Sequence, residues 1–233
     1  RDVNFNIGLT ASHDDLRTDS SASSALQKQS GTFSELSTKY GISVDKRDRA
    51  FMPTEGSIIN FNQEFPIYAD KPFIGNTFSS SFYKPFGENV IGSTKLFLSS
   101  INAINNEDVR LSKRKVLNSR RLRGFERNKV GPVDGSDHIG GNYAAALNFD
   151  TNLPNLLPDS SNIDVGFFLD VGNVWGVDYD SSLDDSNKIR SSTGLTANWL
   201  SPIGPMTFVL SENIAKADTD EAQSFTFNIG TSF

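Results

Sequence analysis

Residues 162–171 read Asn-Ile-Asp-Val-Gly-Phe-Phe-Leu-Asp-Val and alternate between apolar and polar side chains. The apolar set is Ile163, Val165, Phe167 and Leu169, and the polar set is Asp164, Gly166 and Asp170. Successive side chains of a β-strand point to opposite faces, so this alternation predicts a strand with one apolar face.

The same alternation recurs along most of the chain and predicts about ten strands. The predicted strands are residues 2–11, 32–43, 57–67, 73–83, 89–101, 141–150, 162–171, 189–200, 205–213 and 223–233. Most of them are close to the ~10 residues that a tilted strand needs to cross a membrane. The pattern at 32–43 is the weakest of the set.

The connections between these strands alternate in length. Gly87-Glu88 and residues 201–205 are tight turns, whereas residues 12–30, 102–140, 172–188 and 214–222 are long and polar. Short turns at one end and long loops at the other are typical of outer-membrane barrels. We therefore predict an all-β, antiparallel transmembrane β-barrel. A soluble β-sandwich also alternates, so the pattern alone leaves it open.

The amino-acid composition excludes several classes of function. The 233 residues contain no cysteine, which excludes disulfides, thiol catalysis and zinc–thiolate sites, and the net charge of -6 argues against nucleic-acid binding. The mean hydropathy of -0.36 is compatible with a barrel, because only alternate residues of a barrel strand meet lipid. We expect neither a cofactor nor a metal ion.

Four motifs follow one another in the second half of the chain. They are Leu122-Arg123-Gly124-Phe125-Glu126, Phe168-Leu169-Asp170-Val171-Gly172, the turn at 201–205, and a last segment with Phe225, Phe227, Ile229, Gly230 and Phe233. In this order they resemble the BamA family of outer-membrane protein assembly factors. The resemblance is specific from about residue 116; upstream it rests on residues 45–48 and 53–56. Residues 116–121 lack the glycine pair usual before the Arg-Gly-Phe motif.

The resemblance implies a fold and a function. Residues 1–233 would be the last ten or so strands of a sixteen-stranded barrel, with a lumen-directed loop at about 102–140 and the POTRA domains absent from this chain. The whole protein would fold and insert β-barrel proteins in the bacterial outer membrane through a lateral seam, without ATP. Its implied partners are nascent outer-membrane β-barrel proteins, accessory assembly lipoproteins, lipid and lipopolysaccharide. A two-partner secretion or related translocation pore and a ten-stranded outer-membrane protease are the alternatives.

The resemblance also implies where the motifs meet. Arg123 would reach an inner wall formed by Phe168, Asp170 and Gly172, and Gly124 would let the loop turn there. The alternative is an exposed arginine in a mobile loop. The last strand, ending at Phe233, would close the barrel against the first strand at a seam that opens sideways.

The remaining charged residues have plainer interpretations. The loop carries a basic run of Arg110, Lys113, Arg114, Lys115, Arg120, Arg121, Arg127 and Lys129. It could contact lipopolysaccharide phosphate or an acidic lumen wall, but we favour simple solvation. Solvation is likewise favoured over cation binding for the acidic loops at 178–185 and 218–221. His138 with Asp137 or Asp134 is the single catalytic candidate, and we expect no enzyme activity.

Overall fold

The chain forms one antiparallel sheet whose strands pair in sequence order. The computed structural model describes residues 2–105, 107–154, 156–158, 161–202 and 204–230. Within these ranges the sheet has ten strands: β1 (Val3–Leu16), β2 (Gly31–Asp45), β3 (Gly56–Ala69), β4 (Phe73–Pro85), β5 (Ile91–Ala103), β8 (Tyr143–Leu153), β9 (Ile163–Trp175), β10 (Arg190–Ser201), β11 (Gly204–Ala215) and β12 (Phe225–Ile229). The predicted all-β, antiparallel architecture is confirmed, and each predicted strand corresponds to an observed one.

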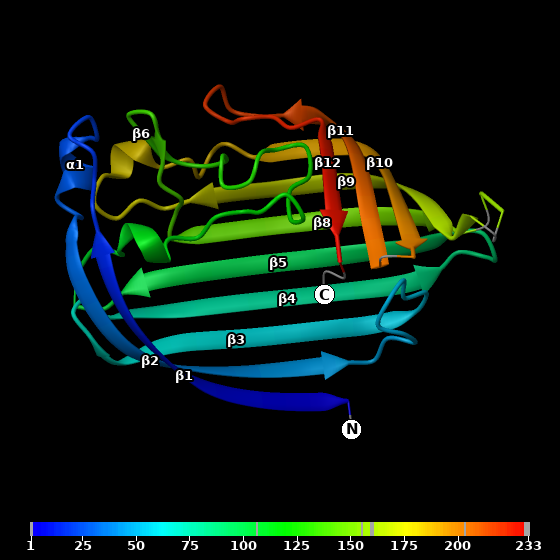
Figure 1. Ribbon diagram of the computed structural model, residues 1–233, viewed down its shortest axis with the longest axis horizontal. Helices are drawn as coiled ribbons and strands as arrows, with labels where there is room; N and C mark the ends of the chain where they lie inside the picture. The colour runs from blue at the N-terminus through cyan, green and yellow to red at the C-terminus, as the bar shows by residue number, and fades with distance from the viewer. Residues whose placement is uncertain (1, 106, 155, 159–160, 203, 231–233) are drawn as a thin grey trace.

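The sheet curls strongly, so that β10, β11 and β12 pass in front of the strands at the back (Figure 1). Its order begins at β1 and ends at β12, and these two strands are not paired with each other in the described ranges. The curl encloses a concave inner face. It has the shape of an incomplete barrel wall.

The connections sort to the two ends of the curl. Residues 17–30, 107–142, 176–189 and 216–224 lie at one end, and residues 46–55, 86–90, 156–158 and 161–162 lie at the other (Figure 1). Two connections break the rule of long loops at one end and tight turns at the other: residues 70–72 form a short link at the long-loop end, and residues 46–55 form a longer turn at the opposite end. The long loops carry a short helix α1 (Ser24–Gln27), 3-10 turns at Leu111–Lys113 and Ser181–Leu183, and a small hairpin of β6 (Val133–Asp134) and β7 (Asp137–His138).

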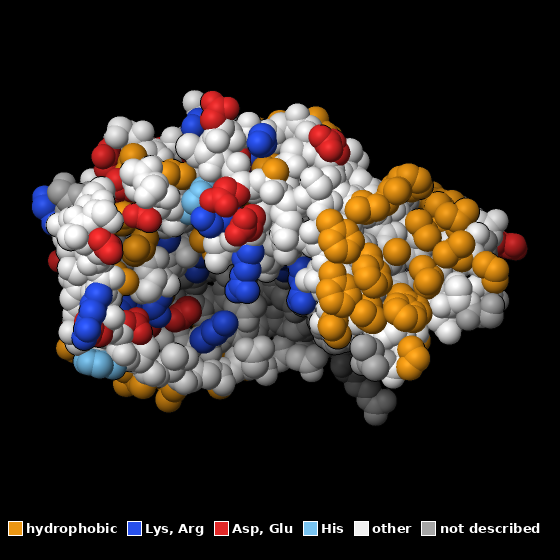
Figure 2. Space-filling model, turned by 45° about the horizontal axis from the view of Figure 1, so that its top comes forward, with side chains coloured by type: hydrophobic (Ala, Val, Ile, Leu, Met, Phe, Trp, Pro, Cys, Tyr) orange, Lys and Arg blue, Asp and Glu red, His pale blue; other side chains and the backbone are white. Residues whose placement is uncertain are grey.

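The two faces of the sheet differ as the alternation predicts. Phe167 on β9 is 55% exposed and Phe227 on β12 is 45% exposed, whereas Asp170 on β9 is fully buried on the concave side. Hydrophobic side chains gather over the outer face of β10–β12, and the loop end is polar and charged (Figure 2). An apolar outer band is what a wall facing lipid requires.

The concave side is filled by the long loop between β5 and β8. Its residues Leu117, Leu122, Phe125 and Val130 pack against Ala144, Ala146 and Val174 on the inner face of β8 and β9. Alanine on β8 leaves the loop room to approach the wall closely. A second cluster joins Leu26, Ile139 and Val177, so that three long loops meet at one end of the curl. No helix among the described residues is long and apolar enough to cross a membrane.

Candidate functional site

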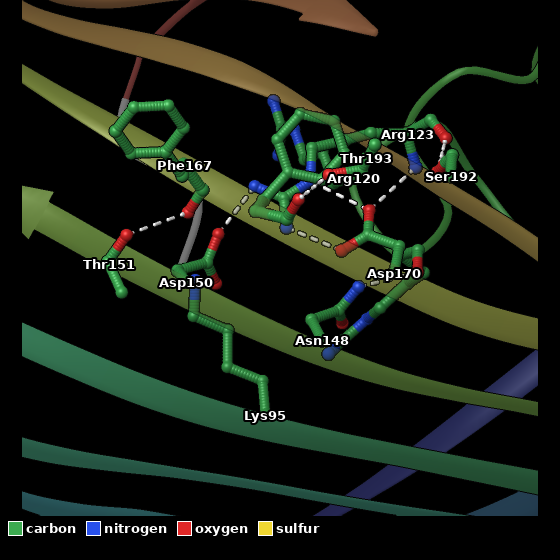
Figure 3. Close-up of polar contacts among 12 residues, drawn as sticks. Lys95, Arg120, Arg123, Asn148, Asp150, Thr151, Phe167, Asp170, Ser192 and Thr193 are labelled. Carbon is green, nitrogen blue, oxygen red and sulfur yellow. Dashed lines mark hydrogen bonds and ion pairs between the residues drawn. The ribbon is translucent and has the colours of Figure 1, made fainter. Parts of the chain in front are cut away.

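Arg123 lies at the tip of the long loop, against the inner wall. Its Nε donates to Asp170 Oδ2 at 2.7 Å and its Nη2 donates to Asp170 Oδ1 at 2.5 Å. Its Nη1 donates to Asp150 Oδ1 at 2.6 Å, and Lys95 Nζ lies 3.1 Å from the other oxygen of Asp150. Figure 3 shows Arg123 between the two carboxylates, with Lys95 on the neighbouring strand. One guanidinium therefore ties the loop to β8 and β9.

The ring of Phe168 completes the contact. The guanidinium carbon of Arg123 lies 3.9 Å from the centre of this ring. Guanidinium suits such a site because it stays charged, stacks on an aromatic face and grips a carboxylate with two parallel hydrogen bonds. Arg123 is 9% exposed. The structure thus brings together Arg123, Phe168 and Asp170, and the alternative of a solvated arginine in a mobile loop is wrong.

Backbone contacts hold the same tip in place. The Arg123 N–H donates to Asp170 Oδ2 at 2.9 Å, and the Ser192 hydroxyl of β10 donates to the Arg123 carbonyl oxygen. Gly124 has a φ of +87°, and a Cβ there would lie 3.0 Å from Ser192 Cβ. Only glycine satisfies both the conformation and the close approach. On the wall, a Cβ at Gly172 would lie 3.4 Å from the side chain of Leu122.

The rest of the motif divides between core and surface. Leu122 and Phe125 are buried in the loop core, whereas the side chain of Glu126 is exposed. The backbone N–H of Glu126 donates to the Glu221 carbonyl oxygen at 2.9 Å, and the Gln223 N–H donates to the Gly124 oxygen at 3.0 Å. The loop therefore pairs like a short strand with the connection between β11 and β12.

Half of the basic run pairs with acidic side chains of β2 and of two other loops, and the solvation interpretation is wrong for Arg110, Lys113 and Arg114. Arg110 Nη2 lies 2.7 Å and Lys113 Nζ 2.9 Å from Glu35 Oε2 on β2. Arg114 pairs with Asp178, and Lys129 pairs with Glu221 at 2.7 Å. Arg120 and Arg127 are exposed, as solvation predicts, while Lys115 and Arg121 are partly buried. Glu35 escaped notice in the sequence because its strand has the weakest alternation.

Comparisons with known proteins assign the chain to a family. The Omp85 superfamily domain matches residues 1–233. The chain belongs to the Omp85 superfamily. Among curated relatives, it is 26% identical to the outer membrane protein assembly factor BamA of Neorickettsia risticii, over 100% of the chain and 32% of the relative. It is 28% identical to the sorting and assembly machinery component 50 homolog of Mus musculus, over 68% of the chain and 35% of the relative.

A solved structure shares the fold. The crystal structure of BamA from Haemophilus ducreyi lacking POTRA domains 1-3 superposes with a TM-score of 0.87 at 22% identity, over 97% of the Omp85 chain and 50% of that structure. The Omp85 chain spans about a third of the length of the curated relatives named above. The family, the fold and the BamA relatives identify it as an integral β-barrel of the bacterial outer membrane.

A second buried arginine escaped the sequence analysis of the Omp85 chain. Arg190, at the start of β10, is fully buried, and its Nε and Nη2 each donate to Asp220 at 2.8 Å. Its Nη2 also donates to Asp185 at 2.6 Å, and its Nη1 donates to Asn173 Oδ1 at 2.6 Å. Arg190 thus joins the two acidic loops to β9. A lone arginine between two acidic loops was the available signal.

The acidic loops are therefore not simply solvated. Asp178 accepts the Val109 N–H at 2.7 Å as well as the Arg114 contact. Burial opposes ionisation of Asp178, but these two donors hold its pKa below the ordinary value. At the other acidic loop, the hydrogen bond from Lys129 lowers the pKa of Glu221. Among the described residues, no three His, Cys, Asp or Glu side chains are arranged to hold a metal ion.

The last strand is short and ends at a bend. β12 covers Phe225–Ile229 and pairs with Met206–Leu210 of β11. Phe225, Phe227 and Ile229 are exposed on its outer face. Gly230 follows with a φ of +99°, a conformation that favours glycine. Phe233 lies outside the described residues.

The catalytic candidates contact residues of other loops. His138 Nε2 lies 3.6 Å from Glu221 Oε1, on a different loop. Asp134 accepts the Ser23 hydroxyl at 2.6 Å and the Tyr179 hydroxyl at 2.9 Å. These contacts tie loops together at the end of the curl. General acid–base catalysis would need a base free to reach a substrate proton.

Proposed function

We propose that this Omp85 chain forms the seam-bearing part of a barrel that folds and inserts outer-membrane β-barrel proteins, without ATP or a cofactor. The relatives named BamA support an assembly role. The observation that carries the proposal for this chain is the short terminal strand. Nascent β-barrel proteins are then the clients, and accessory lipoproteins, lipid and lipopolysaccharide are the further partners.

Among the residues that the structure describes, the hairpin β11–β12 has one edge that no strand pairs with. Hydrogen bonds between β11 and the last segment run from Ser211 N–H to the Ser224 oxygen and from Gly230 N–H to the Pro205 oxygen. β11 continues to Ala215, whereas residues 221–223 pair with the long loop instead. Among the described residues, no strand pairs with the other edge of β12. Within a bilayer, each unsatisfied backbone group costs several kcal/mol.

An incoming client strand can supply the missing partners. Adding a strand to an exposed sheet edge gives main-chain hydrogen bonds without any chemical energy source. The client edge that results is itself unpaired and can accept the next strand. Insertion then proceeds by successive strand pairing at the seam, and no reacting group is required.

The Arg123 loop supports this edge from inside. Arg123 holds the loop on β8 and β9, and the loop in turn pairs with residues 221–223 just before β12. The hairpin β11–β12 is therefore fastened at its loop end and free along its outer edge. Such an arrangement keeps the edge in register while it accepts a partner.

A disulfide lock tests the proposal in the full-length protein. A cysteine at Asn228 joined to one in the first strand of the complete barrel should abolish client insertion while the barrel stays folded. The matched control joins Asn228→Cys to Thr207→Cys, its cross-strand partner on β11, which leaves the seam free. Insertion at the normal rate in the seam-locked protein would refute the lateral route.

The two alternatives have their own assays. A translocation pore must pass its substrate through the lumen, where Leu122, Phe125 and Val130 are now packed. Steady conductance and secretion by the seam-locked protein would favour the pore. We also propose that the chain has no enzyme activity; peptide hydrolysis lost on His138→Ala would contradict this.

A further inference from the structure

A groove lies on the outer wall of the sheet, near the long-loop end. It has a volume of about 300 Å³ and is lined mainly by Leu96, Ala145, Leu147, Val171, Trp175 and Ile189. These residues come from β5, β8 and β9 and from the segment that leads into β10. The groove is separate from the Arg123 site, which is on the opposite face of the same strands.

A small residue and an overhanging loop create this hollow. Ala145 lies between Leu98 on β5 and Asn173 on β9, its cross-strand neighbours. Its short side chain recesses the wall at this point. The loop is held over the wall because Asn173 Nδ2 donates to the Asp185 oxygen at 3.0 Å. Ile189, 64% exposed, then projects beside the hollow.

The position of the groove across the membrane is marked by an aromatic pair. Tyr143 and Trp175 stack with ring centres 5.7 Å apart, and the Tyr143 hydroxyl donates to Asn102 at 2.7 Å. Aromatic side chains with a polar tip gather where lipid meets water. The groove therefore begins at the interface on the long-loop side and extends along the hydrocarbon region.

We propose that this groove is a binding site for one acyl chain of a membrane lipid in the leaflet beside the long loops. The surroundings of this wall are hydrocarbon, and a recess left empty would deprive its lining of contact atoms on one side. In lipid, close packing rather than release of water drives association. A linear chain can fill a narrow recess that a side chain from another barrel cannot enter along its length.

The chemistry of the floor favours a lipid over a peptide. Asn173 and Ser186 are the polar residues of the lining, and the side-chain atoms of Asn173 already have partners. Its Nδ2 donates to backbone oxygens of the overhanging loop, and its Oδ1 accepts from Arg190 Nη1 and the Val174 N–H. The amide of Asn173 is thus already engaged and is not open to a peptide backbone. Lys188, next to Ile189 in the chain, has a half-exposed side chain whose Nζ lies 3.2 Å from Asp185 Oδ1.

The site rests on the transmembrane orientation of the wall and does not depend on client insertion. It can therefore be tested apart from the proposed assembly function. The full-length protein is reconstituted in phosphatidylethanolamine vesicles doped with an analogue that carries a diazirine in one acyl chain. After irradiation, the cross-linked peptides are mapped and quantified by mass spectrometry.

The expected result is enriched cross-linking to residues 143–153 and 186–189 relative to the apolar wall at 204–215. Ala145→Leu fills the recess and should lower the yield at the groove about fivefold, which corresponds to about 1 kcal/mol at tenfold per 1.4 kcal/mol. Ala197→Leu, a similar change on the outer face of β10, should leave the yield unchanged. Equal cross-linking along the whole wall, or an Ala145→Leu protein that labels like the original, would overturn the proposal.

A second variant protects the test against misfolding. Ile189→Ala removes the overhang and leaves the strand wall intact. It should also lower cross-linking at 143–153, while the mobility of the folded barrel on a gel stays that of the original. If the folded Ile189→Ala protein labels as strongly as the original, the overhang does not form a site.

Discussion

Replacing Arg123 by alanine is the sharpest test of the loop contact. The change removes three side-chain hydrogen bonds, two to Asp170 and one to Asp150, and the stacking on Phe168. Asp150 keeps Lys95 at 3.1 Å, whereas Asp170 keeps a single donor, the backbone N–H of residue 123. The main loss is therefore at Asp170, which is fully buried.

The size of the effect follows from that burial. Removing one partner of a buried ion pair costs about 3–5 kcal/mol, because a charge is left without compensation. The remaining backbone donor offsets part of this loss. We therefore expect the free energy that holds the loop in its docked position to fall by about 3–4 kcal/mol, in the lower part of the same range. At tenfold per 1.4 kcal/mol, the undocked population should rise about a hundred- to a thousandfold.

Amide hydrogen exchange measures that population directly. In the folded full-length protein, amides of residues 122–130 should exchange faster in Arg123→Ala by this factor. Arg127→Ala, in the same loop but exposed, is the matched control and should change little. Arg123→Lys should rescue only partly, because a point charge cannot make the forked contact. Exchange in Arg123→Ala no faster than in Arg127→Ala would refute the reasoning. So would a failure of Asp170→Asn to recover part of the loss in the Arg123→Ala background.

Three further changes test other parts of the structure. Arg190→Met should expose loops 176–189 and 216–224 to protease, at about 3–5 kcal/mol, because Asp220 loses its cation and Asp185 keeps only Lys188, whereas Lys188→Met should not. Phe208→Lys places a charge on the lipid side, at about 2–4 kcal/mol, and should impair folding in vesicles far more than Asn198→Lys on the lumen side; equal refolding yields would contradict the facing. Gly124→Ala should loosen the loop in hydrogen exchange by about 1–3 kcal/mol. Gly135→Ala is the control that carries the backbone strain without the steric clash, because Gly135 also has a positive φ but its Cβ would meet nothing within 4 Å.

The alternation of side chains was enough to predict the sheet. The two-residue period is a local property, because each side chain of a strand points to the face opposite that of its neighbours along the chain. Counting from Phe167 therefore places Phe168 and Asp170 on the opposite, inner face. The structure pairs Asn198 with Asp164 across β10 and β9. The weak strand at 32–43 and the ends of the strands were less clear, because alternation fades where loops begin to cover both faces.

The partners of the charged residues were decided by the tertiary structure. Asp150 pairs with Arg123, Glu35 pairs with Arg110, and Arg190 pairs with Asp185 and Asp220. The distances along the sequence between these partners follow no strand or helix periodicity. Which charges meet depends on how far the sheet curls and where the loops re-enter it. Sequence alone determined the faces of the strands, because they follow from backbone geometry. The contacts of the loops were decided only by the curl of the sheet in three dimensions. Inside the curl, charged groups lose water, so each buried charge needs a partner from a distant segment.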